Sequence, residues 1–277
     1  ALVEPLLRLG GWMTFAGLMT QALLYADRFL IGALLTLSAV AFYATPLDLV
    51  MRMWILPVAV TQALMPALAA SFATRPAEAA ALLRQGVLGI VLLCLPACLL
   101  LAGAAWELLA LWLGREFADG GAGVLRLLGI GIFFSCLAFA PGSLLDAIGR
   151  PDITARFMLA QAVLFLPLTA AAILWLGIEG AAMVWALRCA TDAFGKAWLV
   201  ARHYLPAVEG LRAATPPLLV ASAGLLAMAL PLSRPALAAL AVLTVAVTTA
   251  WTWRALTDEE RRGLLGRLRR ARVAGGA

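Results

Sequence analysis

The stretch that decides the fold covers residues 25–66 and reads YADRFLIGALLTLSAVAFYATPLDLVMRMWILPVAVTQALMP. It is apolar over most of its length, yet it contains four ionisable residues: Asp27, Arg28, Asp48 and Arg52. A charged side chain at the centre of a bilayer costs at least ~2.5 kcal/mol, so such side chains normally face a protein interior or a water-filled cavity. We therefore expect these four residues to face the inside of a membrane protein.

The composition of the whole chain agrees with this view. Of the 277 residues, 64% are hydrophobic and only 13% are charged, about half the charged share of soluble domains. About eight stretches are long and apolar enough to span a bilayer, which takes roughly 20 residues each. They cover residues 11–34, 39–73, 86–105, 122–147, 154–176, 178–202, 216–231 and 235–253. The sequence therefore predicts an all-α polytopic transmembrane helix bundle.

The distribution of charge predicts the orientation. The net charge is +6, and arginines gather in alternate connections, at residues 75–84, 150–156 and 202–212 and again after residue 253, whereas residues 107–119 are mainly acidic. Positive loops stay in the cytoplasm, so we expect both termini to be cytoplasmic. The positive residues then need no nucleic-acid partner. A signal peptide is not expected because the first apolar run is too long. Because the chain starts with Ala1 and not with Met, we expect either a fragment or a processed N-terminus.

Several local patterns give further expectations. Pro46, Pro57 and Pro66 each remove a helix hydrogen bond, so the second span should be bent. Residues 114–123 are rich in glycine and are expected to form a loop, and residues 149–152 should form a turn. The basic tail from residue 254 is expected either to lie on the anionic inner leaflet as an amphipathic helix or to be disordered.

The ionisable residues inside the spans are the candidates for function. Asp48 and Arg52 are four residues apart, as are the members of the series Arg188, Asp192 and Lys196, so each set should share one helix face. They could be self-satisfied pairs that only orient helices. Alternatively, they could line a wet cavity for an anionic substrate, because the cations Arg28, Arg52, Arg188 and Lys196 outnumber the carboxylates Asp27, Asp48 and Asp192 by one.

No cofactor, metal site or catalytic residue is expected. Walker A, HExxH, paired CxxC and GxSxG patterns do not occur in the sequence. The four cysteines all lie within expected spans and should pack as small apolar side chains; they are Cys94, Cys98, Cys136 and Cys189. Arg126, Asp146 and His203 are expected to have structural or interfacial roles near span ends.

An ordered set of phrases resembles a known family. These phrases are GGWMT at 10–14, YADRFLIG at 25–32, LSAVAFY at 37–43, PLDLVMRMWILP at 46–57, LMPAL at 64–68, LWLGREF at 111–117, VLRLLGIG at 124–131, GRPDITA at 149–155 and GIEGAA at 177–182. Over about residues 8–205 the chain is similar to oligosaccharide flippases of the multidrug/oligosaccharidyl-lipid/polysaccharide exporter superfamily. The set as a whole carries the resemblance, since no single phrase is diagnostic.

The resemblance implies a domain organisation and a site. Residues 1–205 would form the second six-helix lobe of such an exporter, residues 206–253 two trailing helices and residues 254–277 a basic cytoplasmic tail. The first lobe is absent from this sequence, so a partner lobe on the same or another chain, or a second copy, is expected. The resemblance also implies a cationic cavity for a polyprenyl-pyrophosphate-linked oligosaccharide, with Arg28, Arg52 and Arg188 among its residues.

The main hypothesis is thus a non-enzymatic flippase of the bacterial inner membrane that works among membrane lipids in cell-surface polysaccharide (O-antigen, lipopolysaccharide) biosynthesis. One alternative is a cation-coupled multidrug exporter of the same superfamily, in which Asp27 or Asp48 would bind the coupling ion. Another is a membrane enzyme of polysaccharide assembly, although no sizeable external loop is expected here. The last is a purely structural membrane subunit, which would leave the charges near mid-membrane unexplained.

Overall fold

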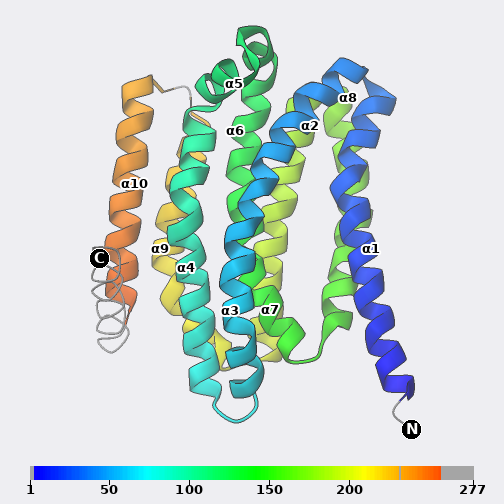
Figure 1. Cartoon of the computed structure of the whole chain (residues 1–277), viewed down its shortest axis with the longest axis vertical. Coiled ribbons are helices and arrows are strands. Elements are labelled where there is room, and N and C mark those ends of the chain that lie inside the picture. The colour runs from blue at the N-terminus through cyan, green and yellow to red at the C-terminus, as the bar shows by residue number, and fades with distance from the viewer. Residues whose placement is uncertain (1–2, 231, 257–277) are drawn as a thin grey trace, which may run out of the picture.

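The computed structural model describes residues 3–230 and 232–256, and within these ranges every regular element is a helix (Figure 1). The elements are α1 (Val3–Leu34), α2 (Leu37–Met51), the 3-10 turn η1 (Arg52–Trp54), α3 (Ile55–Ser71), α4 (Pro76–Gly103), α5 (Ala105–Leu113), α6 (Arg115–Leu137), α7 (Phe139–Ala147), α8 (Pro151–His203), α9 (Ala207–Ala227) and α10 (Arg234–Ala255). The prediction of a helical membrane bundle is confirmed. Residues 257–277, which hold most of the predicted tail, lie outside the described residues.

Six of the described helical stretches are long and apolar enough to cross a membrane. The sequence predicted about eight, and the difference has two causes. Residues 152–203 count as one stretch because α8 joins two predicted spans. The stretch α1 is not among the six; it carries Gln21, Asp27 and Arg28 within a helix of 32 residues.

The helix α8 is two antiparallel halves joined at Gly177. This residue has a φ of 63° and a ψ of −144°, a conformation open to glycine because it has no Cβ. The halves contact each other along their length: the ring of Phe157 lies against Gly195, and the side chain of Gln161 is hydrogen-bonded to that of Asp192. In Figure 1 the first half of α8, in green, lies next to α1, and the second half, in yellow-green, lies in the middle of the bundle.

The second predicted span is bent at one of its three prolines. The α-helical pattern gives way to η1 at Arg52–Trp54 and resumes before Pro57. Pro57 has no N–H to donate to the carbonyl of Met53, one turn earlier, which accounts for the tighter turn here. Figure 1 shows α2 leaning away from the axis of α3. By contrast, Pro46 and Pro66 lie inside continuous helix.

The prediction that the glycine-rich residues 114–123 form a loop is wrong. The structure has helix on both sides of Gly114, which forms the junction between α5 and α6 with a φ of 91°. The later glycines serve close packing instead. A Cβ on Gly123 would collide with the carboxylate of Glu179, and one on Gly121 would press on Leu109 and Phe117. Composition alone does not distinguish these two uses of glycine.

The buried core lies where α4, α6 and the second half of α8 pack together, and its largest side chains include Trp185, Phe133 and Leu125. All four cysteines are buried there, as expected. The helices α9 and α10 pack against each other and against α4. The chain direction places the start of α1 and the end of α10 at one end of the bundle, and α5 at the other, which we call the α5 end (Figure 1).

The predicted turn at residues 149–152 is confirmed at the end opposite α5. Gly149 has a φ of 72°, Pro151 begins α8, and Arg150 pairs with Asp152 at 3.1 Å. Nearby, the hydroxyl of Tyr204 donates to the backbone carbonyl of Phe72 at 2.8 Å. Partial burial raises the pKa of Tyr204, so the hydroxyl keeps the proton that it donates.

Candidate functional site

The helices α1 and α2 are tied together by a buried hydrogen bond. A short connection at Leu35 and Thr36 brings them side by side, and the Thr36 hydroxyl accepts from the Ala39 amide at 3.2 Å, which caps α2. The hydroxyl of Tyr43 on α2 donates to the carboxylate of Asp27 on α1 at 2.9 Å. Asp27 is 6% exposed and Tyr43 is fully buried.

Asp48 is paired with Arg28, not with Arg52. The Arg28 guanidinium forms an ion pair with the Asp48 carboxylate between α1 and α2 and also lies over the ring of Tyr25. The prediction that Asp48 and Arg52 form a same-face pair is therefore wrong. The helix-to-helix neighbour takes the place of the residue one turn away, and Arg52 begins the 3-10 turn, where the spacing of side chains differs from that of an α-helix.

The predicted polar stripe on α8 is only partly joined. Lys196 and Asp192 form an ion pair at 2.8 Å, with side-chain exposures of 11% and 17%. Gln161, from the other half of α8, donates to the second carboxylate oxygen of Asp192 at 3.0 Å. Asp192 is thus held by two donors, and Lys196 already has a carboxylate partner.

Two of the four candidate cations differ from Arg28 and Lys196 because, within the described part of the chain, neither has an ion pair or a hydrogen bond. Arg52 is exposed, and Arg188 is half-buried and close enough to Asp27 to attract it electrostatically. Arg188 lies eleven residues after Gly177, or roughly 16 Å along the helix, which is near the middle of a ~30 Å hydrocarbon layer. These two side chains keep donors available for a ligand.

The position of Arg52 is fixed by its neighbour Trp54. The indole N–H of Trp54 donates to the hydroxyl of Ser135 on α6 at 3.0 Å, and its ring meets the ring of Phe139 edge-on at 5.9 Å. The turn η1 is therefore held against α6 and α7. An arginine on a fixed turn can present its donors in one direction, which favours binding over mere solvation.

Comparison with known proteins shows what the chain is similar to. A family model described as "Polysaccharide biosynthesis protein" matches residues 2–120. A Shigella flexneri protein named "Putative O-antigen transporter" is 30% identical to this chain over 193 residues, which make up 70% of the chain and 46% of that protein. Over these residues the chain is thus similar to polysaccharide biosynthesis proteins. It spans about half the length of the relative that it matches.

The candidate residues fall on two parts of the chain relative to the family match. Asp27, Arg28, Asp48 and Arg52 fall inside the matched residues 2–120. Arg188, Asp192 and Lys196 lie on α8, beyond that match. Arg188 attracts the Asp27 carboxylate electrostatically, which links the two groups.

Sequence reasoning missed the neutral partners of the charged residues. Tyr43, Gln161 and the pair of Trp54 and Ser135 were not selected, although each hydrogen-bonds inside the bundle. The signal was present, because a side chain that can donate or accept within an apolar span needs a partner in a membrane. Tyr43 and Gln161 are isolated polar groups of this kind in residues 37–43 and 154–176.

Proposed function

We propose that this chain is part of a flippase that moves a lipid-linked oligosaccharide across the bacterial inner membrane for cell-surface polysaccharide biosynthesis. The match of residues 2–120 to the family model described as "Polysaccharide biosynthesis protein" and the multi-pass helical fold support this proposal. The name of the Shigella relative, an O-antigen transporter, points to the same class of cargo. The transport step involves no covalent chemistry, because moving a head group requires only binding and release.

The observation that carries the proposal is Arg52, an exposed arginine without an ion pair or hydrogen bond in the described residues, on a turn that Trp54 fixes within a membrane span. A cation at this depth is costly unless it faces water or an anion. A polyprenyl pyrophosphate is an anion that an arginine can bind through paired N–H donors. Among the four candidate cations, Arg52 and Arg188 are the ones with free donors in the described residues, so we assign them the pyrophosphate.

The remaining ionisable residues then hold the wall of the cavity in shape. Arg28 is ion-paired with Asp48, and Lys196 is ion-paired with Asp192. Both cations can therefore make only secondary contacts with the substrate. Transport would follow from rocking of two lobes around this site, as in other alternating-access transporters. Both termini would lie in the cytoplasm, at the end of the bundle opposite α5.

A single lobe supplies only one wall of such a cavity. Since the chain covers 46% of the relative that it matches, we propose that it works with a further lobe, on the same or another chain, or with a second copy. Expressed alone, the 277 residues should fail to restore export in a flippase-deficient strain. Adding the further lobe should restore export, and restoration by this chain as a monomer would refute the two-lobe proposal.

The test of the function is Arg52→Ala in the intact transporter. We expect surface polysaccharide to fall about tenfold or more, because a hydrogen bond to a charged group contributes about 1.5–3 kcal/mol. Arg115→Ala is the matched control: Arg115 is also exposed but lies at the start of α6, at the α5 end. Immunoblots should show equal protein in the membrane. Normal export by Arg52→Ala at normal protein levels would refute the role of Arg52 in binding.

A second candidate function is a cation-coupled exporter, and Asp27 favours it. This carboxylate is buried, and its one hydrogen bond among the described residues comes from Tyr43. Such a group can exchange a proton or bind a cation during transport. Asp27→Asn, which keeps an acceptor for Tyr43, should leave export intact if Asp27 only joins α1 to α2. A loss of ion-dependent transport at normal protein level would instead support coupling.

A further inference from the structure

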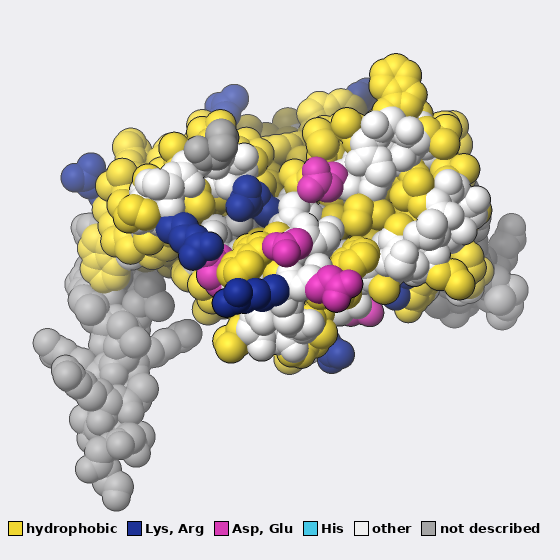
Figure 2. Space-filling model, turned by 90° about the horizontal axis from the view of Figure 1, so that it is seen from above, with side chains coloured by type: hydrophobic (Ala, Val, Ile, Leu, Met, Phe, Trp, Pro, Cys, Tyr) yellow, Lys and Arg dark blue, Asp and Glu magenta, His cyan; other side chains and the backbone are white. Residues whose placement is uncertain are grey.

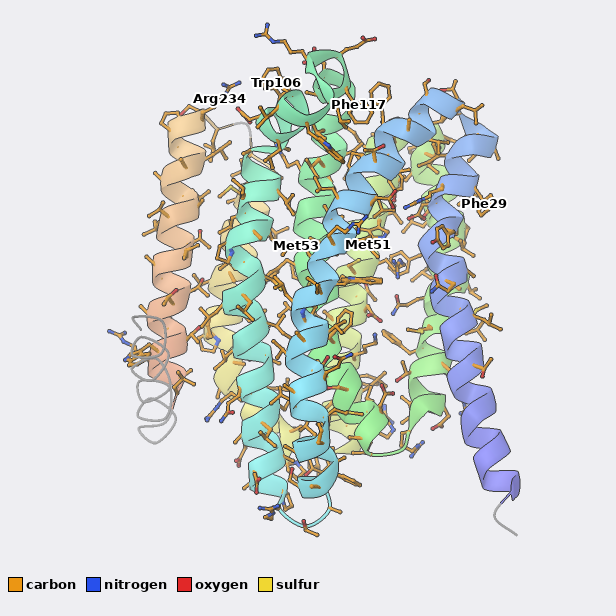
Figure 3. All side chains as sticks on the ribbon, in the orientation of Figure 1. Phe29, Met51, Met53, Trp106, Phe117 and Arg234 are labelled. Carbon is orange, nitrogen blue, oxygen red and sulfur yellow. The ribbon has the colours of Figure 1, made fainter. Side chains whose placement is uncertain are left out.

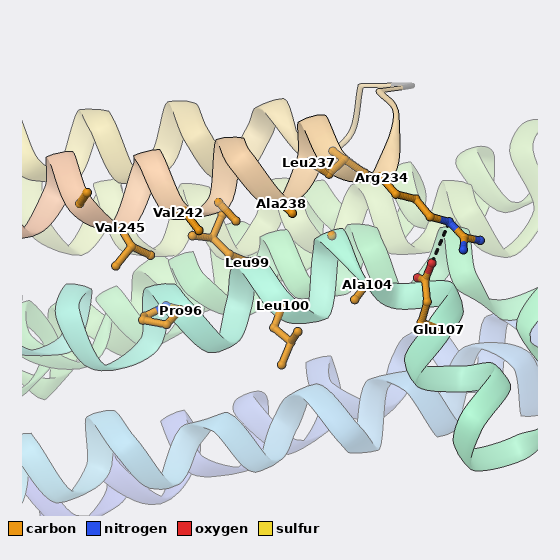
Figure 4. A pocket seen from close by; sticks show the side chains of 13 residues that line it. Pro96, Leu99, Leu100, Ala104, Glu107, Arg234, Leu237, Ala238, Val242 and Val245 are labelled. Carbon is orange, nitrogen blue, oxygen red and sulfur yellow. Dashed lines mark ion pairs between the residues drawn. The ribbon is translucent and has the colours of Figure 1, made fainter.

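A groove of about 630 Å³ runs between α4 and α10, away from the candidate substrate site (Figure 4). Its walls are one face of each helix, with residues repeating at intervals of three and four. The lining residues are Pro96, Leu99, Leu100, Gly103, Ala104 and Glu107 from one side and Arg234, Leu237, Ala238, Ala241, Val242, Val245 and Ala246 from the other. All but two of them are apolar, so the groove suits a hydrocarbon.

The groove opens toward the lipid and has the depth of one leaflet. Leu100 and Val242 line it and are 56% and 70% exposed, so it is open along its side. Its α10 wall runs from Arg234 to Ala246, which is roughly 18 Å at 1.5 Å per residue. Half of a ~30 Å hydrocarbon layer is about 15 Å. An acyl chain that enters at the α5 end would therefore lie in the groove along its whole length.

The polar end of the groove carries one charge of each sign. The Nε of Arg234 lies 3.0 Å from Oε1 of Glu107 (Figure 4). The guanidinium lies over the ring of Trp106, with its central carbon 5.6 Å from the ring centre; Figure 3 labels both residues at the α5 end. This geometry leaves the two terminal nitrogens of Arg234 for a phosphate and the second oxygen of Glu107 for an ammonium group. The side chain of Arg234 is 76% exposed, so a head group can reach it.

We propose that this groove binds a zwitterionic phospholipid, phosphatidylethanolamine, with one acyl chain between α4 and α10. Its phosphate lies on Arg234 and its ammonium group on Glu107. An anionic lipid of one charge would meet the Glu107 carboxylate without a compensating group. A transmembrane helix of a partner protein does not fit, because a cylinder 10 Å wide and 18 Å long takes up about 1,400 Å³. The site does not depend on the cargo that the transporter carries.

Native mass spectrometry of the purified chain tests the proposal. The detergent-solubilised protein is titrated with phosphatidylethanolamine or with phosphatidylglycerol of the same acyl chains. We expect the wild type to prefer phosphatidylethanolamine. Arg234→Gln should weaken its binding about tenfold, since it removes a charged donor. Glu107→Gln should shift the preference toward phosphatidylglycerol. A wild type that prefers phosphatidylglycerol would overturn the proposal.

A matched pair of substitutions on α10 tests the location. Ala238→Leu fills the groove and should abolish retention of phosphatidylethanolamine, whereas Ala239→Leu adds the same volume at the neighbouring exposed residue outside the lining and should have no effect. Ala241→Leu, deeper in the groove, is a second filling variant in case Ala238→Leu aggregates. Equal binding by a monodisperse filling variant and by Ala239→Leu would overturn the proposal.

Discussion

Tyr43 and Asp27 form a buried hydrogen bond, 2.9 Å from the phenolic oxygen to the carboxylate, that joins α2 to α1. The bond fixes the register of these two helices, because a buried carboxylate without a donor is costly. This register decides which other residues of α1 and α2 lie opposite one another. With Tyr43 opposite Asp27, Arg28 is directed toward Asp48, and Arg52 is left without a partner in the described residues.

Removing the hydroxyl should therefore destabilise the bundle. Tyr43→Phe leaves the ring in place and takes away the donor to Asp27, so we expect a loss of about 1–3 kcal/mol in stability. The measurement is the midpoint of thermal unfolding in detergent. Tyr25→Phe is the matched control, because Tyr25 is 45% exposed. Equal midpoints for the two variants would contradict a structural role for the Tyr43 hydroxyl.

The ion pair of Arg28 and Asp48 should be visible in a double-mutant cycle. Arg28→Gln and Asp48→Asn are measured singly and together, and we expect a coupling energy of at most about 1 kcal/mol, since the Asp48 side chain is 61% exposed. The cycle of Asp48→Asn with Arg52→Gln should show no coupling. Coupling to Arg52 instead of Arg28 would show that the sequence spacing, and not the helix contact, sets the pair.

The sequence predicted the helices well because their signal is local. Apolar length gave the spans, and the boundary predicted between residues 176 and 178 coincides with the turn at Gly177. The pair of Asp192 and Lys196 was also predictable, since both lie on one helix face. The partner of Asp48 was not, because Arg28 is twenty residues away and reaches Asp48 only through the packing of α1 on α2.

Glycine has two structural roles here, turn formation and close helix packing, and the sequence alone does not distinguish them. Gly114 and Gly177 have positive φ and form turns, whereas Gly131 is within α6, where a Cβ would lie 2.8 Å from the Cα of Ala186 on α8. We expect Gly131→Ala to destabilise the bundle by about 1–3 kcal/mol through overpacking. Gly89→Ala is the matched control, since its Cβ would meet no atom within 4 Å. In thermal unfolding, the midpoint of Gly131→Ala should be lower than that of the wild type, and the midpoint of Gly89→Ala should be unchanged or higher.

The last prediction concerns orientation. At the α5 end, Figure 2 shows Asp and Glu side chains beside Lys and Arg, surrounded by hydrophobic side chains. The opposite end holds many of the arginines in or near the described connections; among them are Arg75, Arg84, Arg150, Arg156, Arg202 and Arg212. Positive connections remain in the cytoplasm, so the α5 end should face outward.

Single cysteines can test this orientation without removing native ones, because all four native cysteines are buried. Thr74→Cys and Leu205→Cys lie at exposed positions opposite the α5 end and should resist a membrane-impermeant thiol reagent in intact cells. Glu116→Cys, exposed at the start of α6, should react with it. Permeabilised cells should label all three variants, which controls for accessibility. The reverse pattern in intact cells would place the arginine-rich end outside and would also reverse the side from which the substrate is loaded.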